Sequence, residues 1–214
     1  MAMNFITFEG GEGSGKSTQA KMLHQAFITA KINSLLTREP GGTDSAEVIR
    51  NLLIHSETKF HPMSELLLHN VSRFEHAKDV IMPALKNNQT VICDLFVDST
   101  MAYQGYGQKL GRKMPALIHN LLMEGLVPDI TFILDISPTE GLHRANMNNQ
   151  DNNYEKRGLE FHTRVRDGFL EIANIAKNRC VVINADDSIN NIHEIIIDTF
   201  NAASGLNLQY VTER

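Results

Sequence analysis

The feature that most constrains this chain is a glycine-rich segment near its N-terminus, Gly10-Gly11-Glu12-Gly13-Ser14-Gly15-Lys16-Ser17. It matches the pattern G-x-x-x-x-G-K-S/T at every fixed position and follows an apolar run, residues 5–8, that predicts a strand. Glycine tolerates positive φ and carries no side chain, so such a loop can turn its backbone N–H groups toward phosphate oxygens. The helix expected from about Ser17 to Ala30 adds the positive end of its dipole. The segment therefore predicts a nucleoside triphosphate site rather than an ordinary turn.

The loop also predicts two chemical roles. Lys16 is expected to reach the β- and γ-phosphates and to act in catalysis, and the Ser17 hydroxyl is expected to ligate Mg²⁺. The predicted nucleotide-binding residues are Gly10, Gly11, Glu12, Gly13, Ser14, Gly15, Lys16, Ser17 and Thr18.

Apolar strand-like runs alternate with helical patterns along the whole chain. The runs are residues 5–8, 34–37, 90–94, 130–136 and 181–183. This alternation is typical of parallel βαβ units, so we predict an α/β fold with a doubly wound, five-stranded parallel sheet flanked by helices. Ligands are then expected at the carboxyl ends of the strands.

Several local features carry separate expectations. Asp44 and Glu47 suggest a capping box, Ser137 an N-cap, and Pro83 a break or kink in a long helix. Residues 96–111, which contain three glycines, predict a helix followed by a mobile loop, and residues 204–214 a loosely held tail.

Bulk properties limit the classes of protein. At 214 residues the chain fits one domain, residues 1–214, and its net charge of −5 offers no general footprint for nucleic acid. Its two cysteines form no C-x-x-C motif, and its nine histidines form no H-E-x-x-H or other zinc spacing. Without a signal peptide or an apolar run of membrane-spanning length, we expect a cytoplasmic protein with no membrane partner.

The phosphate loop alone does not choose among GTPases, motors and small kinases. The guanine and switch signatures N-K-x-D and D-x-x-G are missing from the sequence, and the chain is short for a motor domain, which favours a kinase of nucleotides or small metabolites. Such an enzyme needs a carboxylate near Mg²⁺. Asp94, at the end of a buried strand, is expected to act in catalysis by holding Mg²⁺ through water, although a simple helix cap remains the alternative.

Further motifs, in order and spacing, resemble the thymidylate kinase family of bacterial type. They are Glu9-Gly10 with the loop, Arg38-Glu39-Pro40-Gly41-Gly42-Thr43, Glu65-Leu66-Leu67-Leu68, Arg73 with His76, Pro83-Ala84-Leu85, Asp94, Ser99-Thr100, Ala102-Tyr103-Gln104-Gly105, Pro128-Asp129 and Val165-Arg166. The resemblance covers about residues 4–185. It implies a phosphate-loop nucleoside monophosphate kinase fold and a homodimer that uses Mg²⁺. The implied reaction transfers the γ-phosphoryl of ATP to dTMP, giving dTDP and ADP for dTTP synthesis.

The resemblance also implies site residues. Arg38 would hold the acceptor phosphate and act in catalysis, Arg73 would donate to a base oxygen, and Tyr103 would pack under the deoxyribose. The sequence alone leaves a solvated arginine at 73 and a core tyrosine at 103 equally open. The implied substrate-binding residues are Glu9, Arg38, Pro40, His69, Arg73, Ser99, Thr100, Tyr103 and Gln104, and Arg144 joins the ATP-binding set.

The chain departs from the family pattern at four places. Leu95 and Gln108 stand where arginine is usual, and His69 stands where an aromatic ring usually stacks on thymine. The lid expected near residues 146–157 has lost its arginines: it carries Asn146, Asn148, Asn152 and Asn153 and keeps Glu155. We expect Arg144 or Arg157 to take over part of the lid role. A kinase of another nucleoside monophosphate, or a nucleotide-binding protein with weak activity, remains the alternative.

Overall fold

Five parallel strands form one sheet in a computed structural model that describes residues 3–147 and 153–212. The strands are β1 (Phe5–Gly10), β2 (Ser34–Arg38), β3 (Thr90–Asp94), β4 (Ile130–Asp135) and β5 (Cys180–Asn184), in the order β2-β3-β1-β4-β5. The central strand, β1, pairs with β3 on one side and β4 on the other. The connection after β1 leads to the edge strand β2, whereas the connection after the neighbouring strand β3 leads across to β4. Because these two connections run in opposite directions, a ligand crevice opens at the carboxyl ends of β1 and β3. The predicted sheet is confirmed.

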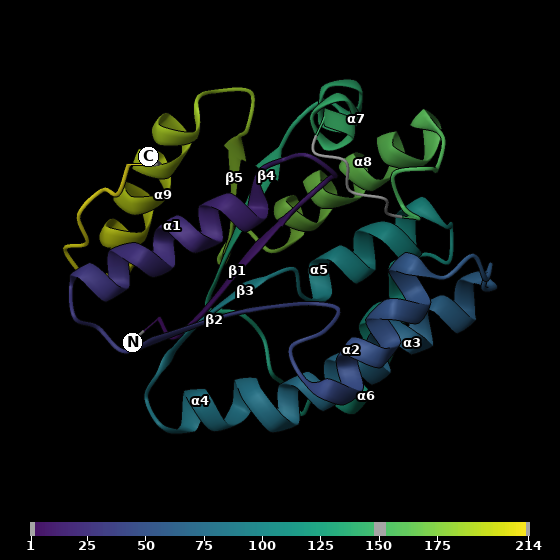
Figure 1. The fold of residues 1–214 in the computed structure, drawn as a ribbon, viewed down its shortest axis with the longest axis horizontal. Coiled ribbons are helices and arrows are strands. Elements are labelled where there is room, and N and C mark those ends of the chain that lie inside the picture. The colour runs from purple at the N-terminus through teal and green to yellow at the C-terminus, as the bar shows by residue number, and fades with distance from the viewer. Residues whose placement is uncertain (1–2, 148–152, 213–214) are drawn as a thin grey trace.

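Helices cover both faces of this sheet (Figure 1). The α-helices are α1 (Lys16–Thr29), α2 (Asp44–Arg50), α3 (Pro62–His76), α4 (Met82–Lys86), α5 (Val97–Thr100), α6 (Lys113–Leu122), α7 (Pro138–Met147), α8 (Leu159–Ile175) and α9 (Ile189–Ser204). Three π-helical segments accompany them: η1 (Asn51–His55), η2 (Ala77–Ile81) and η3 (Met101–Gly107). Helices α1 and α9 pack together on one face, and α8 packs on the other (Figure 1).

The two-residue period of the strands divides the core between these faces. On β1, Ile6 and Phe8 enter the cluster under α1 and α9, whereas Phe5 enters a cluster with Val91 and Cys93 on the opposite face. Successive side chains of a strand point to opposite faces, so a parallel strand covered on both sides is apolar at almost every position. Both cysteines, Cys93 and Cys180, are buried free thiols.

Three local expectations were wrong: the cap of α2, the mobile glycine loop and the loosely held tail. The N-cap of α2 is Thr43, whose hydroxyl accepts from the Ala46 N–H at 3.1 Å, rather than Asp44. At Pro83 the helix is irregular, as expected: the π-helical turn η2 ends directly before α4, and the chain remains helical through the proline. The Ser137 cap is confirmed by its bond to the Glu140 N–H.

The predicted mobile glycine loop is instead the helical segment η3. A Cβ on Gly107 would lie 2.6 Å from Phe161 Cε2 and 2.8 Å from Val165 Cγ2, so glycine there permits close packing of η3 on α8. The C-terminal tail is also held: Leu208 is 2% exposed, and the Asn201 side chain bonds both its N–H and its carbonyl. Within the described residues, no helix is long and apolar enough to cross a membrane.

His193, on α9, is expected to destabilise the fold. Its imidazole is fully buried and neither ring nitrogen has a hydrogen-bond partner in the described part of the chain, while burial lowers its pKa to about 4. His193→Leu should raise the free energy of unfolding by about 1–3 kcal/mol at pH 8, because an unsatisfied polar group is removed.

The gain from His193→Leu should grow as the pH falls from about 6.5 toward 4. Over that window the unfolded imidazole takes up a proton and the folded one does not, so acid destabilises only the wild type through this group. Urea unfolding at pH 8 and pH 5 measures both effects. Equal stability of the variant and the wild type at both pH values would contradict the account.

Candidate active site

The phosphate loop occupies the turn between β1 and α1, as its sequence predicted. Gly15 takes φ +89°, a conformation that side chains disfavour, and directly precedes the first helical residue. The Lys16 ammonium group donates to the Gly11 carbonyl at 2.7 Å, so it is folded back over the loop and ready to exchange that oxygen for a phosphate oxygen.

Gly13 has a different reason to be glycine. A Cβ at this position would lie 2.0 Å from the Gly141 carbonyl oxygen on α7, and a Cβ on Gly141 would lie 2.4 Å from the Glu12 carbonyl oxygen. The loop and α7 therefore touch backbone to backbone. No side chain fits at residue 13 while α7 keeps this position.

Ser17 and Asp94 meet across the crevice at the carboxyl ends of β1 and β3. The Ser17 hydroxyl donates to Asp94 Oδ2, while Asp94 Oδ1 is buried and lacks a partner among the described residues. Hydroxyl and carboxylate oxygens are the ligands Mg²⁺ prefers, and an unsatisfied carboxylate oxygen gives a hydrated ion a reason to bind. The residues present therefore fit Mg²⁺.

A cavity of about 360 Å³ runs from the loop toward α3 and η3. Its lining includes most of the residues predicted to bind substrates: Glu12, Gly13, Ser14, Gly15, Lys16, Ser17, Thr18, Arg38, Pro40, His69, Arg73, Asp94, Ser99, Thr100, Tyr103 and Gln104. It also includes residues that the sequence did not single out as ligands: Glu39, Arg50, Ile54, Leu95, Phe96, Ala145, Tyr154 and Glu155. Four predicted site residues, Glu9, Gly10, Gly11 and Arg144, lie outside this lining.

Arg38 and Arg50 form a cationic end to the cavity next to the loop. Both guanidinium groups donate to the Pro40 carbonyl, at 3.2 and 2.8 Å, and Glu47 pairs with Arg38 at 3.0 Å. Burial, and then the charge of Arg38, lower the pKa of Arg50 from its ordinary value. Two such cations against one wall favour a bound phosphate, which neutralises their repulsion. No sequence motif singled out Arg50; its place in the wall depends on the contact with Pro40 that folding creates.

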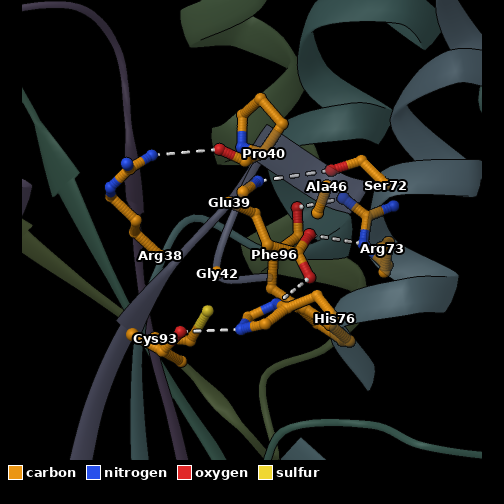
Figure 2. A network of polar contacts seen from close by, with 12 residues as sticks. Arg38, Glu39, Pro40, Gly42, Ala46, Ser72, Arg73, His76, Cys93 and Phe96 are labelled. Atoms are coloured by element: carbon orange, nitrogen blue, oxygen red, sulfur yellow. Dashed lines mark hydrogen bonds and ion pairs between the residues drawn. The ribbon is translucent and has the colours of Figure 1, made fainter. Parts of the chain in front are cut away.

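Arg73 is held rigidly by a buried network (Figure 2). Its Nε donates to Glu39 Oε2 at 2.7 Å, and Nη2 donates to the Phe96 carbonyl and to the Thr100 hydroxyl. The remaining nitrogen, Nη1, is buried with no partner in the described chain. The solvated-arginine interpretation is therefore wrong, since Arg73 is 2% exposed.

His76 completes the network from the other side. Its Nδ1 lies 3.0 Å from Glu39 Oε1 and its Nε2 lies 2.7 Å from the Thr37 hydroxyl (Figure 2 shows the first contact). Glu39, His76 and Cys93 have ligand atoms within 4.8 Å of one another. Both histidine nitrogens are already bonded, and the Arg73 cation occupies the carboxylate, so this group does not suit a metal ion.

His69 is connected to the lid segment through Tyr154. The tyrosine hydroxyl donates to Glu65 Oε1 at 2.7 Å and lies 2.7 Å from His69 Nε2. Because that hydroxyl has one proton, His69 must donate from Nε2. Burial lowers the pKa of His69 to about 3, so the ring is a neutral aromatic surface in the cavity wall.

Glu9 lies beneath the cavity rather than in it. It is fully buried, accepts from the Phe96 N–H at 3.0 Å and from the Ser99 hydroxyl, and burial followed by the charge of Asp98 raises its pKa to about 8. The structure thus makes Glu9 a support for Ser99, which does line the cavity. Tyr103 lies in the wall, with its hydroxyl donating to Glu12 at 2.9 Å.

The two arginines expected to serve the lid are engaged elsewhere. Arg144 contacts Glu140, the Ala185 carbonyl and Asp186, and Arg157 pairs with Glu65 and lies over the Tyr154 and Phe161 rings. Asn148 and Asn152 of the expected lid fall outside the described residues. Leu95 lines the cavity at φ +73°, a strained conformation for a branched residue that its sequence did not signal.

The phosphate loop after the central strand and the arginine residues Arg38, Arg50 and Arg73 line one cavity. This arrangement, with room for two phosphorylated ligands side by side, is that of the nucleoside monophosphate kinases. Comparison with known proteins narrows that class. The profile of the family described as Thymidylate kinase matches residues 8–196, and the chain belongs to this family.

Individual relatives agree with this assignment. A thymidylate kinase of Wolbachia pipientis subsp. Culex pipiens is 49% identical over 198 residues, covering 91% of this chain and 94% of that protein. One from Rickettsia canadensis is 43% identical over 193 residues, covering 90% and 94%. The crystal structure of thymidylate kinase from Ehrlichia chaffeensis superposes with a TM-score of 0.76 at 39% identity, covering 94% of this chain and 99% of that one.

Proposed function

We propose that this chain transfers the γ-phosphoryl of ATP to dTMP, giving dTDP and ADP for dTTP synthesis. One observation carries the proposal: a single cavity joins the phosphate loop, the Arg38–Arg50 pair and the Arg73–Gln104 wall. Its relatives are named thymidylate kinases, and the enzyme class follows from the family. We further propose that it acts in the cytoplasm and that Mg²⁺ accompanies ATP.

Positioning and charge account for the chemistry. The loop N–H groups and Lys16 would hold the β- and γ-phosphates of ATP, while Arg38 and Arg50 would hold the acceptor phosphate beside them. Ser17 and Asp94 would hold Mg²⁺, which supplies charge neutralisation at the phosphate oxygens when bound. Arg50 is therefore our candidate to supply part of the positive charge at the transferring phosphoryl that the missing lid arginines would otherwise provide.

Arg144 suits the adenosine side. It extends from α7, which abuts the loop at Gly141, to the loop that follows β5, where it meets Ala185 and Asp186. Arg144 is absent from the cavity lining, and its contact with the loop after β5 supports a position beside ATP rather than beside the acceptor phosphate. We retain it as a residue that borders ATP rather than the transferring phosphoryl.

A coupled assay of ADP release with dTMP, dUMP, dCMP and AMP as acceptors tests the proposal. We expect dTMP to give the highest kcat/KM. Turnover of dCMP or AMP well above dTMP would favour a kinase of another nucleoside monophosphate. Binding of ATP and dTMP by calorimetry with no dTDP formed would favour a nucleotide-binding protein.

We also propose that the chain forms a homodimer through α2, α3 and α6, which lie close together in Figure 1. Large exposed apolar side chains occur there in pairs four residues apart: Val48 on α2 with Leu52 on η1, Leu67 and Val71 on α3, and Leu117 and Leu121 on α6. Residues spaced by four lie on one side of a helix, so the pairs make apolar stripes on neighbouring elements. Such a patch favours burial against a second copy.

Disrupting this patch is expected to give monomers. Leu67→Lys combined with Leu121→Lys places two charges where the partner would be buried, and Leu121 is 78% exposed, so the monomer fold should tolerate them. Equilibrium sedimentation at micromolar concentration should show a dimer for the wild type and for the control Ile175→Lys, at an exposed site on α8. A monomeric wild type would overturn the proposal.

A further inference from the structure

Glu65, on α3, collects hydrogen bonds from two segments far away in the sequence. It is 5% exposed, and its Oε1 accepts from Gln104 Nε2 at 2.8 Å, from Gln108 Nε2 at 2.5 Å and from the Tyr154 hydroxyl. Its Oε2 accepts from Arg157 Nη2 at 2.8 Å. Glu65 is outside the cavity lining, so it can affect a substrate only through the residues it holds.

The carboxylate decides which way the Gln104 amide faces. An ionised carboxylate accepts hydrogen bonds and donates none, so the amide nitrogen of Gln104 must face Glu65. The Tyr154 hydroxyl, already donating to Glu65, accepts a second bond from the same nitrogen at 3.3 Å. The amide carbonyl is thereby turned away from Glu65, and this oxygen is buried without a partner among the described residues.

Gln104 and Arg73 then offer complementary groups to the acceptor base. Both residues line the cavity, Gln104 with an unpaired acceptor and Arg73 with the unpaired donor Nη1. A thymine or uracil ring presents an N–H donor at N3 and an acceptor at O4, whereas cytosine presents an acceptor at N3 and an amino donor at C4. The pair fits the first pattern and opposes the second, provided that the amide cannot flip.

We propose that Glu65 is a positioning residue that prevents this flip and so makes the pocket select thymine and uracil over cytosine. The proposal rests on the proposed function, because it assumes a pyrimidine nucleotide in the acceptor site. Arg157 supplies the positive charge that pairs with the buried Glu65 carboxylate, because the neighbouring Gln108 side chain is neutral. Tyr154 and Arg157, which lie in the segment expected to form the lid, are thus linked through Glu65 to the recognition of the pyrimidine ring.

The test compares wild type and Glu65→Gln with dTMP, dUMP and dCMP as acceptors. A glutamine at 65 can donate or accept, so it accepts either orientation of the Gln104 amide. We expect the ratio of kcat/KM for dTMP to that for dCMP to fall about tenfold or more, mainly through the acceptor KM. The dTMP-to-dUMP ratio should stay within twofold, because both bases share this edge, and the KM for ATP should also stay within twofold.

Three outcomes would overturn the inference. One is a Glu65→Gln enzyme whose activity falls equally with dTMP and dCMP, as a purely structural role predicts. The second is full discrimination in Gln104→Met, a variant that tests the amide even where Glu65→Gln does not fold. The third concerns the double variant. If Glu65→Gln lowers the dTMP-to-dCMP ratio as much in the Gln104→Met enzyme as in the wild type, Glu65 does not act through Gln104, because Gln104→Met leaves no amide to position. A wild type that forms no dTDP would contradict the proposed function instead.

Discussion

Replacing Lys16 with methionine is expected to lower kcat for dTDP formation by about 10³-fold. Its ammonium group is poised over the phosphate loop, 2.7 Å from the Gly11 carbonyl, and methionine keeps the apolar stem while removing the charge. In phosphoryl transfer most of the catalysis is positioning and charge stabilisation, and losing one such group typically costs 10²-fold to 10³-fold or more. The measurement is the coupled assay at saturating ATP and dTMP.

Lys21→Met is the matched control for this substitution. Lys21 is exposed on the same helix, α1, and is not part of the cavity lining, so its loss should leave kcat within twofold. Calorimetry should show that Lys16→Met still binds dTMP, because the acceptor pocket is built from other elements. A fall in kcat of less than tenfold would exclude the proposed role of Lys16.

Gly141→Ala should raise the KM for ATP at least tenfold, although residue 141 lies on α7 and is far from the loop in sequence. Its new Cβ would lie 2.4 Å from the Glu12 carbonyl oxygen, which is backbone and cannot rotate away. Either the loop or α7 must move, and overpacking of this kind costs about 1–3 kcal/mol. Since the loop N–H groups are proposed to bind the phosphates of ATP, the displacement should appear in ATP binding and in a lower Tm.

Gly158→Ala provides the comparison for that variant. Gly158 has an ordinary φ of −64°, and a Cβ there would meet nothing within 4 Å. It should therefore match the wild type in both KM for ATP and Tm. Gly141→Ala with wild-type KM for ATP would show that the loop and α7 are not in the contact described.

The same contact bears on the small residues of the loop, in a chain whose expected lid also lacks arginines. The sequence shows small residues, Gly13 and Ser14, in the phosphate loop and asparagines in the expected lid, but it does not explain why they are there. The packing of Gly13 on Gly141 supplies a reason for the loop: no side chain fits at residue 13 while α7 is in place. Arg50 offers charge from another direction, at the end of α2.

Much of the site could be predicted because its signals are local. The phosphate loop, the Arg38–Thr43 segment and the strand-end position of Asp94 are short stretches whose chemistry depends on neighbours in sequence. The alternation of apolar runs with helical patterns predicted the sheet for the same reason, since both kinds of pattern are visible without tertiary contacts. The errors at Asp44 and residues 105–107 arose where a capping hydroxyl or a packed helix overrode the local pattern.

The sequence by itself determined the fold class, the phosphate loop and most of the residues that line the cavity. Only the tertiary structure decided what holds them. Tyr154 meets Glu65 across 89 positions, Arg157 meets Glu65 across 92, and Phe96 meets Glu9 across 87. A residue's type is written in the chain, but whether its polar atoms are already paired depends on segments brought together by folding. That is why Arg73 and Gln104, whose roles the sequence left to resemblance, acquire a chemical reason in their unpaired donor and acceptor.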